Sequence, residues 1–515
     1  MKSVFRQFIS QYWILLIIIA IKFTLQFTLV NPVYELHRDE FLHLDQANHL
    51  AFGYISVPPF TSLVSKVIFL LGGGIFWVRF FPALFGALTI VFAWLIAESL
   101  NGNLLSKVVV SLAVTFSVLV RLNILFQPNS FDILAWTILF YLLVQFINTG
   151  KSKYLYWLAI VAAAGFYNKY NIVFLFFGIV TGLLLTPQRT FFTQTSMWKA
   201  AILFIVLLLP NLLWQVVYHF PVIEHMKVLK ENQLDNNSAT GFLISQVMII
   251  FNALPLIFAA LAAFGFYKPF KDYRFAGICF VVVILLFSLL KAKDYYAFGL
   301  YPALIAFGVV YIEKISSRWW NRVIMPLLIV FNLGIFAFTA KLIYPVFSPE
   351  EIIQHKDDFE KMGLLRWEDG KNHHLPQDFA DMIGWKEMAE KSLAAYNTLP
   401  ENEIKKTLII CDNYGQTGAL NYYNRGLMQE AFCLNTDYIF WLPEMQRIEN
   451  ILLVGKKPDP KIVALFRECR EVGKIENKYA REKGTEIFLL VGADDTLTQK
   501  FNSIVEERKS KMDIF

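Results

Sequence analysis

The sequence predicts a polytopic α-helical membrane protein that ends in a soluble α/β domain. Of its 515 residues, 56% are hydrophobic and only 17% are charged, and the mean hydropathy is +0.48. Soluble domains average about 45–50% apolar and about 25% charged residues. Long apolar runs follow one another over the first two thirds of the chain, each close to the roughly 20 residues that cross a bilayer. The last third is charged and alternates short β and α patterns.

The apolar runs predict about eleven transmembrane helices. The first run follows Lys2 and Arg6 but has no small-residue cleavage site after it, so we expect an uncleaved first helix. Residues 60–75 are apolar but contain three consecutive glycines, which favours an interfacial or partly inserted segment. The predicted helices span residues 11–30, 76–98, 104–122, 131–148, 154–168, 171–186, 198–218, 241–266, 275–291, 295–313 and 322–343.

The charges of the loops predict the orientation of these helices. If the N-terminus is cytoplasmic, every second loop should be rich in Lys and Arg. The loops expected inside do carry basic residues, namely Lys107, Lys151, Lys153, Arg189, Lys199, Lys268, Lys271, Arg274, Lys314, Arg318 and Arg322. We therefore expect residues 345–515 on the exterior side, which is the periplasmic side if this is a bacterial inner-membrane protein. The short N-terminus and single exterior domain favour the bacterial setting.

Two domains follow from this reading, a transmembrane domain over residues 1–345 and an exterior α/β domain over residues 346–515. In the second domain, residues 460–473 show a helical pattern, and short β-like runs predict strands at residues 407–412, 437–443, 451–455 and 486–492. The net charge of +6 is accounted for by the inside loops. We therefore predict a membrane partner and no nucleic-acid partner.

Ionisable residues cluster in the loops expected outside, and such residues at membrane depth are candidate functional groups. Arg38, Asp39 and Glu40 stand side by side just after the first predicted helix. Asp39, His43 and Gln46 have the spacing of one helix face. This predicts a short interfacial helix that presents a carboxylate at the membrane surface. The alternative is ordinary solvated charge at the end of a span.

Three lysines on the same side oppose the positive-inside trend. Lys291 and Lys293 lie in one exterior loop, and Lys169 lies in another between two asparagines. A phosphate would compensate them, because ammonium groups act as point charges for it; the alternative is snorkelling to lipid headgroups. Asp132 is expected to cap the fourth helix or, less favoured, to pair with a lysine. No motif requires a metal, so we predict no cofactor and no metal ligands, and leave a divalent metal open.

Together these motifs resemble glycosyltransferase family 39, which includes protein O-mannosyltransferases and lipid A aminoarabinose transferases. The resemblance is carried by "RDE" after the first span, then "GYISVPP", "NKYN" and "KAKDYYAFGLYPAL". It covers about residues 1–345 and implies the GT-C fold and a polyprenyl-phosphate sugar as donor. Family members commonly have "DHPP" or "DQPP" where this chain has Ser56 and Val57 before the two prolines. The role of that polar pair is therefore in question here.

The resemblance also implies roles for individual residues. Asp39 and Glu40 match the acidic pair of the family, and Lys293, Tyr295 and Tyr296 match a second motif. We predict one displacement at the anomeric carbon with inversion, in which Asp39 is the general base and Glu40 positions groups or supports Asp39. The predicted phosphate-binding residues are Arg38, Lys169, Lys291 and Lys293. The predicted substrate-positioning residues are His43, Tyr54, Asp132, Tyr295 and Tyr296.

The resulting hypothesis is an integral membrane glycosyltransferase that moves a hexose or pentose from a polyprenyl phosphate to an exterior hydroxyl. The acceptor could be a lipid, a glycan or a protein. The alternative is a transporter or flippase of lipid-linked sugars. Transporters often show internal repeats and binding groups near the midplane, whereas here no repeat is seen and the charges crowd one surface. A third hypothesis, a noncatalytic scaffold, would tolerate loss of Asp39.

Overall fold

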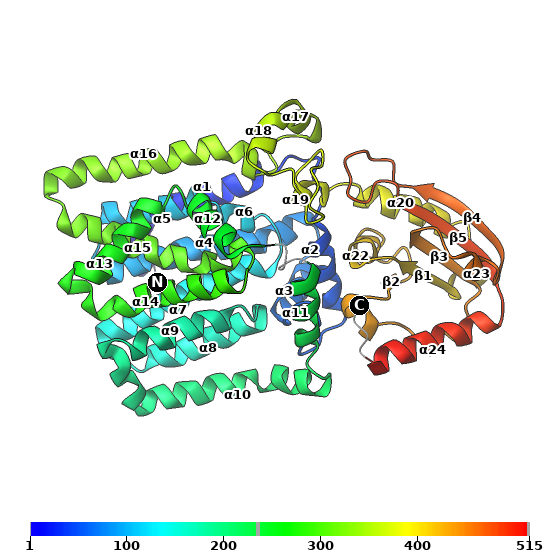
Figure 1. The fold of residues 1–515 in the computed structure, drawn as a ribbon, viewed down its shortest axis with the longest axis horizontal. Coiled ribbons are helices and arrows are strands. Elements are labelled where there is room, and N and C mark those ends of the chain that lie inside the picture. Colours follow the sequence, from blue (N-terminus) through cyan, green and yellow to red (C-terminus); the bar gives the residue numbers. More distant parts are fainter. Residues whose placement is uncertain (1, 233–236, 512–515) are drawn as a thin grey trace. The chain divides into compact units, whose positions relative to one another are not determined.

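The protein, seen in a computed structural model, is mostly helical and is described over residues 2–232 and 237–511 (Figure 1). Its internal contacts divide the chain into two compact units. The first, here called the helical unit, comprises Met1–Val30, Val78–Leu213 and Lys227–Val346. The second, here called the mixed unit, comprises Asn31–Trp77, Trp214–Met226 and Phe347–Phe515. The units interleave in sequence, whereas the predicted domains are consecutive; those domain boundaries stay a prediction.

Long apolar helices build the helical unit, and many of them run alongside one another in Figure 1. Its main helices are α1 (Lys2–Thr28), α4 (Ile75–Ser99), α5 (Leu104–Thr115), α6 (Leu119–Leu122), α7 (Pro128–Thr149), α8 (Lys153–Asn168), α9 (Ile172–Leu184), α10 (Thr195–Val217), α12 (Ala239–Ile249), α13 (Leu254–Phe266), α14 (Arg274–Leu289), α15 (Tyr301–Ile315) and α16 (Arg318–Ile343). The 3₁₀ helices η2 (Pro187–Thr193), η4 (Lys268–Tyr273) and η5 (Asp294–Leu300) join some of them. Helix α11 (Pro221–Asn232) contains the point, between Met226 and Lys227, at which the chain passes from the mixed unit to the helical unit.

Seven helices of the described residues are long and apolar enough to cross a membrane, or up to nine if each of two bent pairs is one span. The predicted count of eleven is not confirmed. The predicted span 241–266 is two helices, α12 and α13, bent by 106° at the break between them. The predicted span 104–122 ends early as α5 and continues in the short α6. Hydropathy averages over such breaks, so it shows the apolar run but not its bend.

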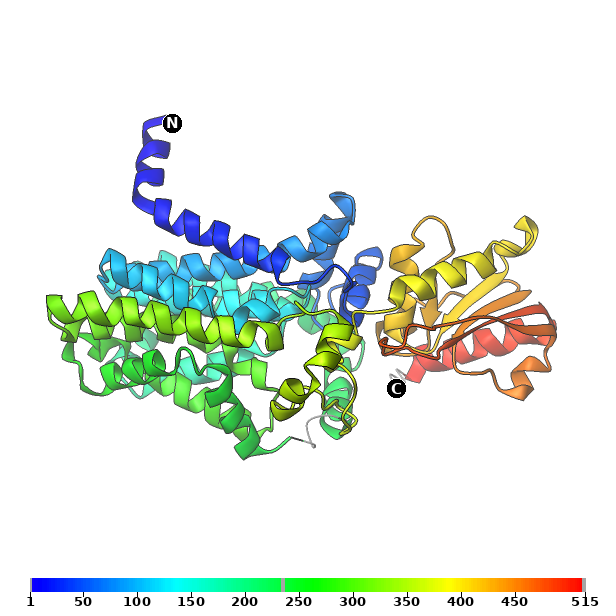
Figure 2. The ribbon, with the colours of Figure 1, turned by 90° about the horizontal axis from the view of Figure 1, so that it is seen from above.

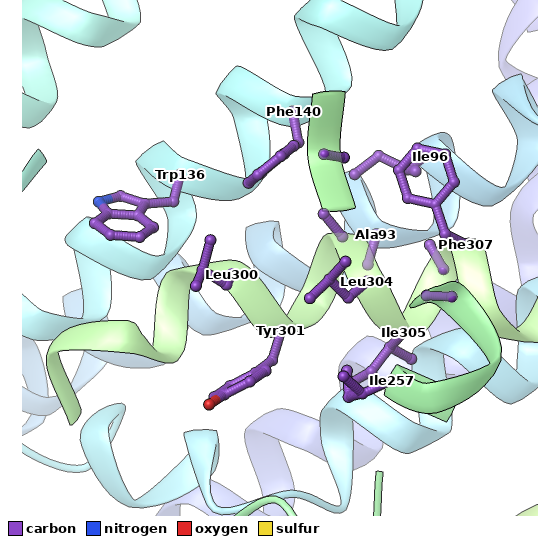
Figure 3. Packing of buried hydrophobic residues seen from close by; sticks show 14 of the residues in the cluster. Ala93, Ile96, Trp136, Phe140, Ile257, Leu300, Tyr301, Leu304, Ile305 and Phe307 are labelled. Atoms are coloured by element: carbon purple, nitrogen blue, oxygen red, sulfur yellow. The ribbon is translucent and has the colours of Figure 1, made fainter. Parts of the chain in front are cut away.

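The core of the helical unit is apolar and aromatic. One cluster contains Trp136 and Phe140 of α7, Leu304 and Phe307 of α15, and Ile257 of α13 (Figure 3). Close helix contacts elsewhere depend on glycine. A Cβ on Gly308 of α15 would collide with the backbone of Leu256, and one on Gly182 of α9 with the backbone of Phe275. Small residues at such crossings let helix backbones approach, as is common in membrane proteins.

A five-stranded sheet organises the mixed unit, in the order β2-β1-β3-β5-β4. Strand β1 (Thr407–Cys411) pairs in parallel with β2 (Phe432–Cys433) and with β3 (Asn450–Gly455). Strand β5 (Glu486–Ala493) pairs antiparallel with β3 and with β4 (Phe466–Lys474). The buried runs of β1 and β3 are rich in Ile, Leu and Val, as central strands covered on both faces require.

Helices cover both faces of this sheet. Leu408 of β1 packs in one cluster with Leu497, Phe501 and Val505 of α24 (Thr496–Lys511). Helices α20 (Trp385–Tyr396) and α22 (Tyr414–Tyr423) contact the sheet and each other. In Figure 2 the orange strands lie between the yellow α20 and the red α24. The remaining short helices of this part are α17 (Pro349–Gln354), α18 (Lys356–Lys361), α19 (Gln377–Ala380), α21 (Glu401–Ile404), α23 (Pro460–Val463) and the 3₁₀ helix η6 (Thr436–Phe440).

The segment after α1 is part of the mixed unit and holds the acidic pair. It contains α2 (Arg38–Asp45), the 3₁₀ helix η1 (Gln46–Asn48) and α3 (Phe60–Leu70). Helix α2 packs on α22, and a Cβ on Gly418 of α22 would collide with Phe41 of α2. The Glu35 carboxylate accepts hydrogen bonds from the backbone N–H groups of Gly384 (3.2 Å) and Lys386 (2.8 Å). The predicted short helix around Asp39 is therefore present and is anchored by residues from the C-terminal part of the chain.

Two element predictions in the C-terminal part are wrong. Residues 437–443 were expected as a strand but begin within η6, because Asp437 and Tyr438 are buried against the α2 segment. Residues 460–473 were expected to be helical, but only the short α23 forms before strand β4. The pairing of β4 with β5 along most of its length overrides the local helical pattern. The other three predicted strands are found as β1, β3 and β5.

Candidate functional site

Helix α2 begins with a reciprocal cap that uses Glu40. The N-cap residue His37 accepts a hydrogen bond at Nδ1 from the backbone N–H of Asp39 (3.2 Å), and Glu40 Oε2 accepts one from the backbone N–H of His37 (2.6 Å). Such a capping box satisfies backbone donors that the helix itself cannot pair. Glu40 is only 1% exposed. The cap gives the Glu40 side chain a structural role that makes no reference to a substrate.

Asp39 occupies a different environment from its neighbour. Its side chain is 38% exposed, and its Oδ1 accepts a hydrogen bond of 2.8 Å from the Tyr414 hydroxyl. Burial acts to raise the pKa of Asp39, but the nearby charges of His37 and Arg38 and the Tyr414 hydrogen bond outweigh it, and the pKa falls to about 2. Asp39 is therefore an accessible carboxylate that is ionised at neutral pH.

Arg38 presents a cation beside this carboxylate. Its guanidinium carbon lies 4.6 Å from the centroid of the Tyr414 ring, in a cation–π contact. Its Nε is buried and has no hydrogen-bond partner among the described residues. Unpaired buried donors are costly, so this group has unused capacity for an anion. The geometry is compatible with the predicted phosphate-binding role, which stays a prediction.

A second ion pair supports His37 from the C-terminal part. Arg481 Nη1 donates to both carboxylate oxygens of Asp381 at 3.1 and 3.0 Å. Asp381 also contacts His37, whose Nε2 lies 3.7 Å from Asp381 Oδ2. Together with Tyr414, these residues were missed by sequence reasoning. No local pattern could have found them, since Tyr414 and Asp39 are separated by 375 positions.

His43 and Tyr54 lie deeper than the exposed edge of Asp39. His43 is 5% exposed, and burial lowers the pKa of its imidazole. Tyr54 is 1% exposed, and its hydroxyl donates to the backbone carbonyls of Gln46 (3.3 Å) and His49 (2.9 Å). These bonds give Tyr54 a structural role in closing its own loop. The predicted role of both residues in positioning substrate stays a prediction.

Ser56 is held by a carboxylate from far along the chain. Asp437 is fully buried and accepts hydrogen bonds from the Ser56 hydroxyl (2.6 Å), the backbone N–H groups of Ile55 (2.6 Å) and Ser56 (3.2 Å), and the Gln46 amide (2.7 Å). Charge-assisted bonds of this kind are stronger than neutral ones. The loop before the two prolines is therefore bound to a carboxylate, which comes from Asp437 of η6 and not from the loop's own sequence.

We expect Asp437→Asn to destabilise the loop at Ile55 and Ser56 by about 2 kcal/mol. An amide can accept at only one of the two oxygen positions, so at least one buried N–H or O–H loses its acceptor. Hydrogen exchange of the Ile55 and Ser56 amides should accelerate by roughly 30-fold, the rate equivalent of that free energy. Asp495→Asn is the matched control, since the Asp495 side chain is 92% exposed. Unchanged exchange in Asp437→Asn would contradict the assigned role.

The helical unit gathers the predicted cation and its aromatic partners. Lys169, between α8 and α9, donates from Nζ to Asn129 Oδ1 at 2.9 Å. The same Nζ lies 4.9 Å from the Tyr295 ring centroid and 4.2 Å from that of Tyr296. Partial burial lowers the pKa of Lys169 to about 8, although the charge of Asp132 opposes that shift. We call Lys169, Asn129, Asp132, Tyr295 and Tyr296 the lysine cluster.

Other predicted residues of this region have clear positions. Lys293 is near enough for its charge to act on Lys169, whereas no side-chain contact joins Lys291 to the lysine cluster within the described residues. Asp132 does not cap α7, because Gln127 is the N-cap residue there. Its carboxylate instead accepts from Trp136 Nε1 and Asn171 Nδ2, both at 3.0 Å. The favoured capping prediction for Asp132 is therefore wrong, and the alternative, pairing with a lysine, stays a prediction, with the charge of Asp132 acting on Lys169.

Lys22 is a further charged residue that sequence reasoning missed. It lies within the apolar run of α1 and is 1% exposed. Its Nζ donates to Gln26 Oε1 (2.9 Å) and to the backbone carbonyl of Ala83 (2.8 Å). The signal was visible in the sequence, since a lysine inside a predicted span is a functional candidate by default. Its contacts here are those of a donor that joins α1 to α4.

Comparison with known proteins agrees with this architecture. A family model described as dolichyl-phosphate-mannose-protein mannosyltransferase matches residues 56–214. An uncharacterised protein of Aquifex aeolicus (strain VF5) is 26% identical over 319 residues, which are 57% of this chain and 60% of that protein. The chain thus spans about 60% of the length of this relative.

Two crystal structures share the fold over almost their whole length. ArnT from Cupriavidus metallidurans in the apo state matches with a TM-score of 0.64 at 13% identity, over 93% of this chain and 98% of that one. The same protein bound to undecaprenyl phosphate matches with a TM-score of 0.62 at 12% identity, over 92% and 97%. The predicted fold class, a GT-C type membrane protein with a C-terminal α/β domain, is confirmed. So is the resemblance to glycosyltransferase family 39.

Proposed function

We propose that this chain, a membrane protein of the GT-C fold that resembles glycosyltransferase family 39, transfers a sugar from a polyprenyl phosphate to an acceptor hydroxyl. The observation that carries the proposal is the accessible, ionised carboxylate of Asp39, held by Tyr414 beside the cation Arg38. The match to the mannosyltransferase family model supports the reaction class. The structure of ArnT bound to undecaprenyl phosphate supports the donor class. The sugar, the acceptor and inversion at the anomeric carbon belong to the proposal alone.

In the proposed mechanism, Asp39 accepts the proton of the acceptor hydroxyl. The acceptor oxygen attacks the anomeric carbon while the bond from that carbon to the phosphate oxygen breaks. The proton passes to Asp39, and the electron pair of the broken bond leaves on the polyprenyl phosphate. With a pKa of about 2, Asp39 is in its base form at neutral pH but is a weak base. Proton transfer should therefore come late, after the attacking oxygen has gained positive charge.

The cations have the complementary task. The leaving phosphate gains negative charge as the bond breaks, and preorganised donors stabilise such charge most effectively. Lys169 is suited to this because Asn129, Tyr295 and Tyr296 fix its ammonium group, and Lys293 adds a second charge nearby. Arg38, with its unpaired buried Nε, is a further candidate. Lys291 has the least support, since no contact joins its side chain to the lysine cluster within the described residues.

The test of the proposed function is turnover by the purified protein in nanodiscs. Undecaprenyl-phosphate sugars of several kinds would be supplied together with crude envelope acceptors. We expect one donor to yield undecaprenyl phosphate and labelled acceptor in equal amounts. Turnover of none of these donors, with flipping of the same lipids in liposomes, would contradict the proposal and favour the transporter hypothesis.

We expect Tyr414→Phe to shift the acid limb of the kcat/KM profile to higher pH. The Tyr414 hydroxyl hydrogen bond is one of the interactions that lower the pKa of Asp39, so its removal should raise that pKa. The base form is lost as pH falls through the pKa, so the activity of the variant should decline at a higher pH than that of wild type. Tyr422→Phe is the control, because its hydroxyl donates to the Gly73 carbonyl instead. Superimposable profiles would refute this role for Tyr414.

A further inference from the structure

The mixed unit contains a cleft that the proposed glycosyl transfer does not use. Its volume is about 800 Å³, and it opens at one edge of the sheet. It is lined by residues that directly follow β1, by residues that directly follow β3, and by the turn that precedes β5. Cys411 at the end of β1 is paired with Val454 of β3, and Gly455 at the end of β3 is paired with Glu486 at the start of β5, so all three segments meet at this edge.

The position of the cleft in the sheet is the one where α/β proteins bind ligands. After β1 the chain turns to β2 on one side, and after β3 it continues to β4 and β5 on the other side. The connections that leave the carboxyl ends of these neighbouring parallel strands therefore diverge. Such a topological switch point leaves a crevice outside the strand ends, and ligands of open α/β sheets bind there.

The carboxylates of the cleft are already held in place. Glu482 accepts hydrogen bonds from Asn413 Nδ2 (3.2 Å), Gln416 Nε2 (2.7 Å) and Thr485 Oγ1 (2.9 Å). Asp412 accepts one from the backbone N–H of Lys456 at 2.7 Å and fills the space that a Cβ on Gly455 would occupy. Gly455 has φ of +152°, which also favours glycine. These bonds hold Asp412 and Glu482 in place, and Glu486, the third carboxylate of the lining, has Lys474 Nζ at 3.9 Å from its Oε1.

The basic side chains of the cleft are in the opposite situation. Lys456, Lys457 and Lys483 are exposed. In the described part of the chain, none of the three ammonium groups forms an ion pair or a hydrogen bond. The same part holds no group of three His, Cys, Asp or Glu side chains that could bind a metal ion. In that part of the chain the three lysines are therefore the charged groups of the cleft whose ends are free to bind a ligand, and they come from two segments of its lining.

We propose that this cleft binds a small organic anion that carries a phosphate or a carboxylate group. Ammonium groups act as point charges for such groups. A volume of about 800 Å³ is far larger than bare phosphate needs and lies in the range of sites for small organic ligands. The proposal concerns binding to the C-terminal part and does not depend on the glycosyl transfer proposed above.

The test is calorimetric titration of the full chain in nanodiscs with glucose 6-phosphate and with glucuronate. Inorganic phosphate and glucose are titrated in parallel. We expect saturable binding of at least one organic anion, weakened by added salt because the lysines are exposed. The double variant Lys456→Gln/Lys457→Gln should weaken it by roughly tenfold. The control Lys386→Gln/Lys500→Gln, which removes two exposed lysines outside the cleft, should bind as wild type.

Hydrogen exchange locates the site independently of affinity. The bound anion should slow exchange in the segments 412–416, 455–457 and 482–485. Binding of neither organic anion, or equal binding in the cleft double variant, would overturn the proposal. Binding of inorganic phosphate as tight as that of glucose 6-phosphate would overturn the organic ligand, and equally tight binding of glucose would overturn the anion requirement.

Discussion

Asp39→Asn should lower the turnover number by a factor of about 10² to 10⁴, the range that a positioned general base contributes. An amide cannot accept the acceptor proton, and it also removes the negative charge opposite Arg38. Asparagine is otherwise isosteric, and its Oδ1 can still accept the hydrogen bond of 2.8 Å that the Tyr414 hydroxyl donates. Donor binding should change little, so the loss should fall on kcat more than on the KM of the donor.

The neighbouring carboxylate makes the matched comparison. Glu40→Gln removes a charge one position away, but Glu40 is buried and accepts the backbone N–H of His37 in the capping box of α2. We expect it to lower stability by about 1 kcal/mol through the weakened cap and to change kcat by only a few fold. Asp358→Asn, at an exposed position of α18, controls for loss of charge in the mixed unit.

Stability must be compared at neutral pH for this pair of variants. Folding lowers the pKa of Asp39 to about 2. Its ionised form therefore stabilises the folded chain above the pKa of the unfolded state, and this contribution is lost as pH falls toward 2. Full activity of a folded Asp39→Asn protein would remove Asp39 as the base, and loss of activity in Glu40→Gln alone would transfer the role to Glu40.

Lys169→Met should reduce kcat/KM by a factor of about 10² to 10³, the usual effect of removing one preorganised donor to developing negative charge. Methionine keeps the apolar stem against Tyr295 and Tyr296 but loses the ammonium group that lies 4.2 Å from the Tyr296 ring centroid. The loss should be shared between donor KM and kcat, since the phosphate is charged before and after the bond breaks. Lys151→Met, at an exposed position before α8, is the control.

The pH profile of wild type carries a second signature of Lys169. Its pKa of about 8 means that the free protein loses this cation as pH rises through 8. The profile of kcat/KM should therefore fall on the basic side near that pH, because kcat/KM reports the free enzyme. The arginine in Lys169→Arg keeps its charge above pH 8, so the basic limb of the kcat/KM profile should move to higher pH. If the basic limb of the wild-type profile near pH 8 is also found in Lys169→Met, that limb belongs to the titration of another group.

The fold class could be predicted from the sequence because a lipid bilayer restricts which segments can cross it. Apolar runs such as those of α7 and α16 follow from the need to satisfy backbone groups inside the bilayer, and they need no knowledge of partners. Strands β1, β3 and β5 were readable for a related reason, since buried parallel or central strands are short continuous apolar runs. The bend between α12 and α13 was not predicted, because hydropathy averages over the break, although Pro255 in the first turn of α13 marks it in the sequence.

The sequence predicted which charged residues belong to the candidate site but not which interactions each of them makes. Arg38, Asp39 and Glu40 were visible as charges at the end of an apolar run, and Lys169 and Lys293 as lysines on the unexpected side. Their different roles were not visible, because adjacent carboxylates look alike in a sequence. The cap that occupies Glu40 is local and could have been inferred from the spacing of positions 37 and 40.

The partners of Asp39 and Ser56 come from the other end of the chain. Tyr414 donates to Asp39, and Asp437 accepts from Ser56, across separations of 375 and 381 positions. Hydropathy and periodicity are properties of neighbours in the chain, so they identify which segments enter the membrane and which groups are charged. Protonation state, exposure and hydrogen-bond partner depend on groups brought together by folding. In this protein these properties are set when α2 packs against α22 and when the loop that contains Ser56 binds Asp437 of η6.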